Sequence, residues 1–183
     1  MPRSPRDNAP GLRHVIGQSV SAHALFYDDH ARHTFMALLT GTFERYSMSV
    51  VAYCLLSTHY HLIVETTEPD LSRSLQWLNS RFAETINGEA GERGHLFGAR
   101  FWSKRIETDE QLLGTVRYLA RNPIEAGLCR SAEEWPWSSY TVLVLGMRRP
   151  PFLRPGLVLS LLGSGTTALR RLRAFVEDGV ALS

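Results

Sequence analysis

Four short stretches of apolar and β-branched residues predict strands. They are "HVIGQSVSA" (14–22), "MSVVAYCLLS" (48–57), "HLIVETT" (61–67) and "RFWSKRIE" (100–107). The second and third are separated by only a few residues near Ser57 and Thr58. Because so short a connection joins antiparallel strands, we expect these two to pair as neighbours.

Helical periodicity marks the segments between the strands. Residues 28–47 and 71–86 each carry an apolar stripe with helical spacing, and Asp70 is a candidate N-cap for the second. A third helix is expected over about 109–121, starting at the capping box of Thr108 and Gln111 and ending before Pro123.

This order of elements predicts an α+β fold, a ferredoxin-like antiparallel sheet with helices on one face. Two short apolar helices, "LVLSLLG" and "TTALRRLRAFVEDG", follow as a C-terminal helical appendage. We therefore divide the chain into a flexible basic arm (1–10), a main domain (11–146), and a loop with the helical appendage (147–183).

Composition narrows the class of protein. The chain has 183 residues, 44% hydrophobic and 21% charged, and no apolar run long enough to span a membrane. Cys54 and Cys129 are too few and too far apart for a zinc knuckle or a disulfide framework. A cytoplasmic protein without a membrane partner is expected.

Charge gives weak support for nucleic-acid binding. The net charge is only +2, but nearly all the positive charge is arginine, with Lys104 the single lysine, and it is clustered. Arginine binds phosphate well through its two-pronged guanidinium. Aromatic residues interrupt the cluster around the fourth strand, a combination typical of single-strand binding. The candidate DNA contacts are Arg100, Trp102, Lys104, Arg105 and Arg121.

Two histidines lie one residue apart in an otherwise apolar segment. Side chains alternate along a strand, so His59 and His61 project to one face and Tyr60 and Leu62 to the other. The histidines can supply two nitrogen ligands to a divalent cation. They can equally be partly exposed side chains near the start of the strand.

The third helix offers two further groups. Tyr118 and Asn122 are four residues apart and share a helix face. They also have an ordinary interpretation, with Tyr118 in the core and Asn122 capping the helix before proline. Taken with the histidines, they indicate a metal site of His59, His61 and Asn122, holding Mg²⁺ or Mn²⁺ beside a tyrosine nucleophile. A tyrosine hydroxyl ordinarily ionises near a pH of about 10, so it needs an activating site.

These segments resemble the HUH single-tyrosine transposases, in particular the REP-associated tyrosine transposases. "YCLLSTHYHLIVE" (53–65) is similar to the strand motif of that family, and "YLARNPIEAGLC" (118–129) to its helix motif. The segments "GHLFGARFWSKRIETDEQLL" and "WPWSSY" and the C-terminal tail also resemble it, from about Gly11 onward.

The resemblance implies metal-dependent nicking of single-stranded DNA near a hairpin, and strand transfer through a 5′-phosphotyrosine. It assigns the nucleophile to Tyr118, the metal ligands to His59, His61 and Asn122, and the catalytic domain to residues 11–146. The expected partner is single-stranded or hairpin DNA, the expected location the cytoplasm at the nucleoid. A homodimer, with Tyr118 serving the histidines of a partner, stays open.

The chain departs from the family in the segment after its first strand. "GQSVSAHAL" stands where relatives are basic, and Ser57, Thr58, Ala120 and Glu125 replace the usual residues of the two motifs. The alternative function is therefore a domesticated module that binds hairpin DNA without cutting it. A small metal-dependent hydrolase is a third option.

Overall fold

The four strands form one antiparallel sheet. The computed structural model describes residues 9–20, 24–91, 93–98 and 100–178. The strands β1 (Gly11–Gln18), β2 (Met48–Leu55), β3 (His59–Thr66) and β4 (Trp102–Arg105) are arranged in the order β2-β3-β1-β4. Every neighbouring pair is antiparallel, as the ferredoxin-like prediction requires, and β1 and β3 occupy the centre. The predicted fold class is thus confirmed.

The helices expected from the sequence occur in the predicted order, and one short helix, at Ser139–Val144, was not expected. They are α1 (Asp29–Arg45), α2 (Leu71–Ala90), α3 (Asp109–Glu125), α4 (Ser139–Val144), α5 (Gly156–Leu162) and α6 (Gly165–Glu177), with a 3-10 turn at Ala132–Glu134. The strand predicted at 14–22 lies instead at Gly11–Gln18. Positions 21 and 22 of that prediction, and positions 1–8 of the predicted basic arm, lie outside the described residues.

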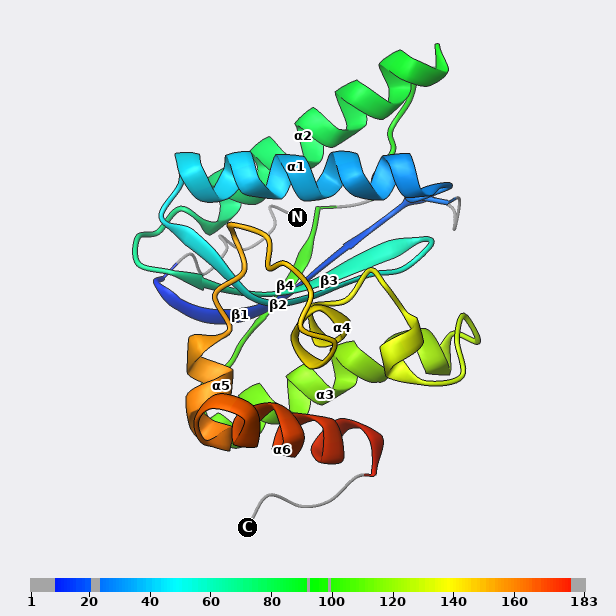
Figure 1. Cartoon of the computed structure of the whole chain (residues 1–183). Coiled ribbons are helices and arrows are strands. Elements are labelled where there is room, and N and C mark those ends of the chain that lie inside the picture. The colour runs from blue at the N-terminus through cyan, green and yellow to red at the C-terminus, as the bar shows by residue number, and fades with distance from the viewer. Residues whose placement is uncertain (1–8, 21–23, 92, 99, 179–183) are drawn as a thin grey trace.

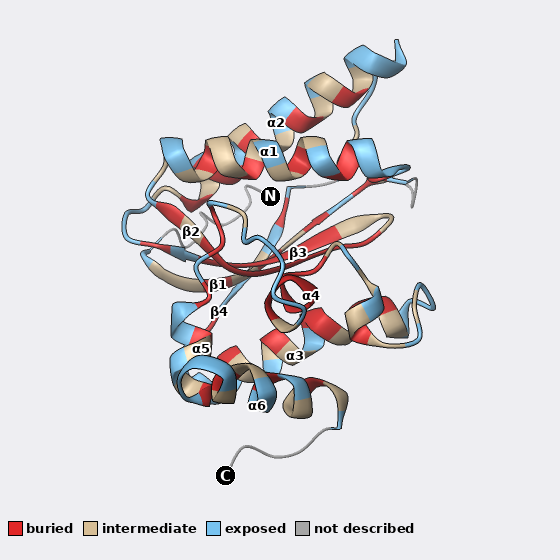
Figure 2. Ribbon diagram, in the orientation of Figure 1, coloured by how far each residue is buried: buried red, intermediate tan, exposed pale blue. Residues whose placement is uncertain are grey.

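Helices cover both faces of the sheet rather than one. Figure 1 shows α1 and α2 on one side, and α3 with the C-terminal helices on the other. Both faces of β2 and β3 are apolar: Tyr53 and Leu62 pack with α1 and α2, whereas Cys54 and Ile63 pack with α3 and α6. Figure 2 shows these strands as buried along most of their length. Because apolar surface on both sides must leave water, a second helical layer is needed.

The α3 helix is longer than predicted. It continues through Pro123 to Glu125, and the Ala126 N–H donates to the carbonyl of Asn122 across 2.9 Å. Proline removes one backbone hydrogen bond near the helix end. Pro123 is itself buried, and this burial offsets part of that loss. Asn122 therefore lies inside a regular helix.

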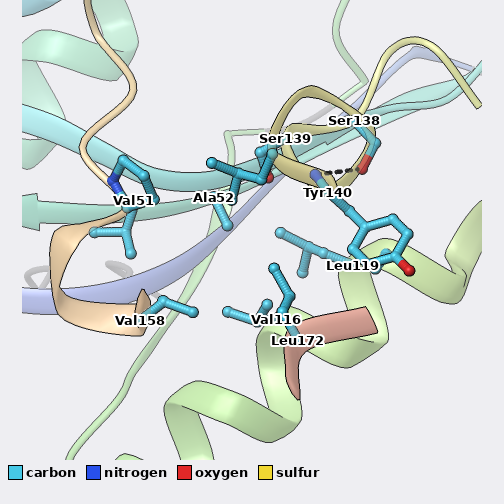
Figure 3. A pocket seen from close by; sticks show the side chains of 12 residues that line it. Val51, Ala52, Val116, Leu119, Ser138, Ser139, Tyr140, Val158 and Leu172 are labelled. Carbon is cyan, nitrogen blue, oxygen red and sulfur yellow. Dashed lines mark hydrogen bonds between the residues drawn. The ribbon is translucent and has the colours of Figure 1, made fainter. Parts of the chain in front are cut away.

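Close packing fixes α3 in place. Figure 3 shows Val116 and Leu119 of α3 pointing toward side chains from β2, α4, α5 and α6. The space left among them is about 10 Å³, no more than a single water needs. The Tyr140 N–H donates to the Ser138 hydroxyl across 3.1 Å and starts α4 beside this cluster. The C-terminal helices thus hold the helix that carries Tyr118.

The tryptophans of "WPW" tie the chain to the turn between β2 and β3. The Trp135 indole N–H donates to the Leu55 carbonyl across 2.9 Å, and the Leu55 N–H donates to the Trp137 carbonyl across 2.9 Å. The guanidinium of Arg32 lies 5.6 Å from each indole ring. These contacts anchor the turn that leads into His59.

No helix in the described ranges combines the length and the apolar content that crossing a bilayer requires.

Candidate active site

The strand β3 presents its histidines toward α3. Tyr60 and Leu62 enter the core under α1 and α2, so His59 and His61 face the opposite layer, as the alternation predicts. His61 is buried, with 1% of its surface exposed, whereas His59 is half-buried. The position near the surface expected for both holds for His59 alone.

A third histidine joins them from β1. In the β1–β3 register His14 lies opposite Ile63, two residues along β3 from His61, and therefore faces the same layer. Its Nε2 is 3.0 Å from Nδ1 of His61, and the two rings stack with centroids 5.2 Å apart. Nδ1 of His59 lies 3.0 Å from the Thr58 hydroxyl. His59 and His61 therefore each have a hydrogen-bonding partner at Nδ1.

Burial keeps this cluster uncharged. Desolvation lowers the pKa of His61 to about 3, helped by His59 and His14, and lowers the pKa of His14 to about 4, helped by the charge of Lys104. Desolvation also lowers the pKa of His59. At neutral pH the rings are unprotonated, the form in which imidazole binds a metal.

Tyr118 lies at the open side of the cluster. Its side chain is 43% exposed, and its ring stands perpendicular to that of His61 with centroids 5.5 Å apart. Tyr118 is therefore not a core residue, and it meets His61 of its own chain. Asn122 is 8% exposed and sits one turn further along α3, which continues past it, so it is not the helix cap. Both ordinary interpretations of the pair are excluded.

The donor groups fit a divalent cation. Nε2 of His61 is buried and has no hydrogen-bond partner within the described part of the chain. A buried nitrogen without a partner is costly, and a metal ion would satisfy it. No three His, Cys, Asp or Glu side chains among the described residues are grouped to hold a metal. Asn122, the third ligand predicted from the sequence, is an amide and so is not among these residue types.

A groove of about 420 Å³ opens next to Tyr118. Its walls come from β1, β4 and α3, because Ile16 lies opposite Trp102 and His14 opposite Lys104 in the sheet. The lining residues are His14, Ile16, Trp102, Lys104, Arg105, Ile106, Gln111, Gly114, Thr115 and Tyr118. Trp102 is half exposed in this groove. An aromatic surface and two cations thus lie beside the tyrosine.

Three of the five predicted DNA contacts line the groove, and two do not. Trp102, Lys104 and Arg105 are among its walls. Arg100 is exposed in the segment before β4. The guanidinium of Arg121 donates to the carbonyl of Val176 across 3.0 Å and so ties α3 to α6. Arg121 has a structural contact that its sequence context does not reveal.

Comparison with known proteins identifies the family. The model of the IS200-like transposases matches residues 13–121, more than half of the chain and including the histidine pair and Tyr118. The chain belongs to the IS200-like transposase family. Asn122 lies one residue beyond the match.

Two known proteins illustrate what this chain is similar to. A protein of Haemophilus influenzae that carries the name REP-associated tyrosine transposase is 26% identical over 117 residues, 58% of this chain and 66% of that protein. The match spans just under two thirds of that relative. The solved structure of a REP-associated tyrosine transposase bound to a REP hairpin is 16% identical, with a TM-score of 0.69. It covers 84% of this chain and 92% of that one, and it shows the same fold.

His14 was not among the site residues expected from the sequence. Its alternation with Val15 along β1 indicates a strand, but nothing local shows that β1 lies beside β3. The resemblance begins near Gly11, but none of the motifs that carry it includes His14. The pairing of β1 with β3, which the tertiary fold alone supplies, places it against His61.

Proposed function

We propose that this transposase nicks single-stranded hairpin DNA in a metal-dependent reaction and transfers the strand through a 5′-phosphotyrosine on Tyr118. One observation carries the proposal: the exposed ring of Tyr118 stands beside His61, whose buried Nε2 has no partner among the described residues. The proposed site of action is the cytoplasm, at the nucleoid.

The site would hold its cation through His59, His61 and Asn122. Bound Mg²⁺ or Mn²⁺ supplies Lewis-acid polarisation of a phosphodiester oxygen. The histidines bind without releasing a proton, because burial lowers the pKa of both. Asn122 adds an oxygen ligand, which suits these metals.

Tyr118 is the nucleophile in this proposal. Its oxygen attacks the scissile phosphorus and forms a bond to the 5′-phosphate, while the bond from phosphorus to the 3′-oxygen breaks. The tyrosine hydroxyl gives up its proton, and the leaving 3′-oxygen gains one. The position of α3 supports this role, because packing against β2, α4, α5 and α6 holds it beside the sheet. A fixed nucleophile lowers the entropic part of the barrier.

The groove beside Tyr118 is the proposed path of the strand. Lys104 and Arg105 can neutralise phosphates, and the half-exposed indole of Trp102 can stack on an unpaired base. Gln111 and Thr115 of α3 offer polar groups along the same wall. A hairpin substrate is proposed because the structure with the same fold is bound to a REP hairpin.

A module that binds hairpins without cutting them is the second candidate. The end of β1 at Gln18 and the residues after it, Ser19 and Val20, lack the basic side chains expected from the family resemblance, and the net charge is only +2. Fewer phosphate contacts favour a weaker or altered interaction with DNA. The same experiment separates the two candidates.

The test is covalent capture. The purified protein is incubated with Mn²⁺ and single-stranded hairpin oligonucleotides drawn from the DNA around its own gene, and products are separated under denaturing conditions. We expect an adduct whose phosphate maps to the peptide of Tyr118 and which is absent without metal and in Tyr118→Phe. Tyr27→Phe is the matched control, because Tyr27 is similarly exposed, at 53%, and lies outside the site.

Two results would change the conclusion. An adduct that persists in Tyr118→Phe would assign the nucleophile elsewhere and refute the proposal. Hairpin binding without any adduct, in the native protein and with either metal, would establish the binding module instead.

A further inference from the structure

His14 occupies a position between the histidine pair and the groove. Its Nε2 is 3.0 Å from Nδ1 of His61, and its ring meets those of Trp102 and Tyr118 edge-on, at 5.6 Å and 6.1 Å. We propose that His14 is a positioning residue that keeps the proton of His61 on Nδ1, so that Nε2 presents a lone pair to the metal site. The inference rests on the proposed function, because it requires that the site hold a metal.

Two neutral arrangements of the pair are chemically possible. In the first, His14 Nε2–H donates to His61 Nδ1, and His61 carries its proton on Nε2. That N–H would be buried without an acceptor in the described chain, which is unfavourable. In this arrangement Nε2 of His61 would also have no lone pair to offer a metal.

The second arrangement removes both problems. His61 Nδ1–H donates to His14 Nε2, and the buried Nε2 of His61 becomes a free lone pair directed into the site. Metal-bound histidines are commonly held in this way, with an acceptor on the second ring nitrogen that fixes the tautomer and the ring orientation. Here a neutral imidazole from β1 takes the place usually filled by a carboxylate or a carbonyl.

The sheet makes this contact rigid. His14 lies opposite Ile63 on β3, and Ile16 lies opposite His61, so the stagger of the two strands sets the distance between the rings. The rings stack with an interplanar angle of 24°, and the ring of Tyr118 meets that of His61 at 90°. Rotation of His61 about its side-chain bonds would break both contacts.

His59 provides an internal comparison. Its Nδ1 lies 3.0 Å from the Thr58 hydroxyl, so the same orientation is achieved there with a different partner. Removing the Thr58 hydroxyl should affect the tautomer of His59 and leave that of His61 unchanged. Thr58→Val is therefore the matched control for His14→Phe.

The experiment reads the tautomer directly. Long-range ¹H–¹⁵N NMR of the imidazole nitrogens in the metal-free protein, at pH 7.5, distinguishes a proton on Nδ1 from one on Nε2. We expect Nδ1–H for His61 in the native protein and in Thr58→Val, and a shift toward Nε2–H in His14→Phe. The measurement on the native protein needs no variant, so it stands even if a variant folds poorly.

Metal affinity is the second readout. We expect Mn²⁺ binding, followed by electron paramagnetic resonance, to weaken by about 10–100-fold in His14→Phe, the loss typical when a supporting partner of a ligand is removed. His14→Gln can place an amide oxygen near the position of Nε2, and it should restore most of the affinity and the Nδ1–H tautomer.

The outcomes separate this inference from the proposed function. A proton on Nε2 of native His61, or an unchanged tautomer in His14→Phe, would overturn the inference. Equal and complete loss of Mn²⁺ binding in His14→Phe and His14→Gln would overturn it as well, by making His14 a ligand. If His61 has the expected tautomer and the native protein binds no metal, the proposed function fails while the assignment of the proton stands.

Discussion

Gly17 makes room for Tyr60 between the two central strands of the sheet. The residues face each other in the β1–β3 register. A Cβ at position 17 would lie 2.5 Å from the Tyr60 hydroxyl oxygen, and closer still to two carbons of its ring. Carbon atoms in normal contact are about 3.5–4.0 Å apart, so the ring would have to move by about 1 Å or more in Gly17→Ala.

The ring has little freedom to move. Tyr60 is fully buried, its hydroxyl donates to the Asn79 side chain across 2.8 Å, and its ring packs on that of Phe35 with centroids 4.8 Å apart. Overpacking of this kind costs about 1–3 kcal/mol. The gain from replacing a strand glycine by alanine is at most about 1 kcal/mol. From the upper end of the first range, we expect Gly17→Ala to lower the free energy of unfolding by roughly 2 kcal/mol.

Urea unfolding of a double-mutant cycle measures this effect. Tyr60→Leu removes the atoms that the new methyl group meets, so the cost of Gly17→Ala should largely disappear in that background, a coupling of about 1–3 kcal/mol. Gly88→Ala is the control, because no atom lies within 4 Å of a Cβ there and the residue is inside α2. It should be neutral or stabilising by up to about 1 kcal/mol.

Additive effects of Gly17→Ala and Tyr60→Leu on the free energy of unfolding would refute the predicted clash. If Gly17→Ala costs the same with Tyr60 or Leu at position 60, the clash with this ring is not the cause. A native-like stability of Gly17→Ala itself would equally contradict the close packing of β1 on β3.

Three further predictions concern the histidines, the groove and Arg121. In the folded protein the pKa values of His14 and His61 lie below their value in the unfolded chain. Their contribution to the free energy of unfolding is therefore fully present above pH 6.5, and it is lost as the pH falls toward 4 for His14 and toward 3 for His61. Between pH 7.5 and pH 5 the free energy of unfolding, measured by urea titration, should fall by about 2–4 kcal/mol in the native protein and by about half as much in His14→Phe. Equal losses in the two proteins would show that His14 does not contribute to this pH dependence. Trp102→Ala should weaken binding of single-stranded oligonucleotides by about 1–3 kcal/mol in fluorescence anisotropy, with Trp102→Phe close to native. Arg121→Met should leave that binding unchanged while lowering stability by about 1 kcal/mol, because its partner is the Val176 carbonyl; weaker binding would place Arg121 on the DNA path.

Local patterns determined the elements of this protein and the chemical groups of its candidate site. Alternation put His59 and His61 on one face of a strand, and helical spacing put Tyr118 and Asn122 one turn apart. Both relations depend on residues close in sequence, whose geometry follows from the backbone alone. The family resemblance rested on the same short motifs.

The end of α3 was harder to predict from the sequence. Proline disfavours a helical residue before it, which predicts an end near 121, yet the helix continues to Glu125. Burial of Pro123 in the tertiary structure offsets the local preference, and a local rule contains no such term.

Only the tertiary structure decided how distant segments meet. Pairing β1 with β3 placed His14 against His61, and the apolar second face of the sheet brought α3 and Tyr118 to the histidines. The contact of Arg121 with Val176 joins residues 55 positions apart. Such contacts depend on strand order and on which surfaces are buried together. These are properties of the whole chain, because apolar area and hydrogen bonds are satisfied jointly by segments that no sequence window contains.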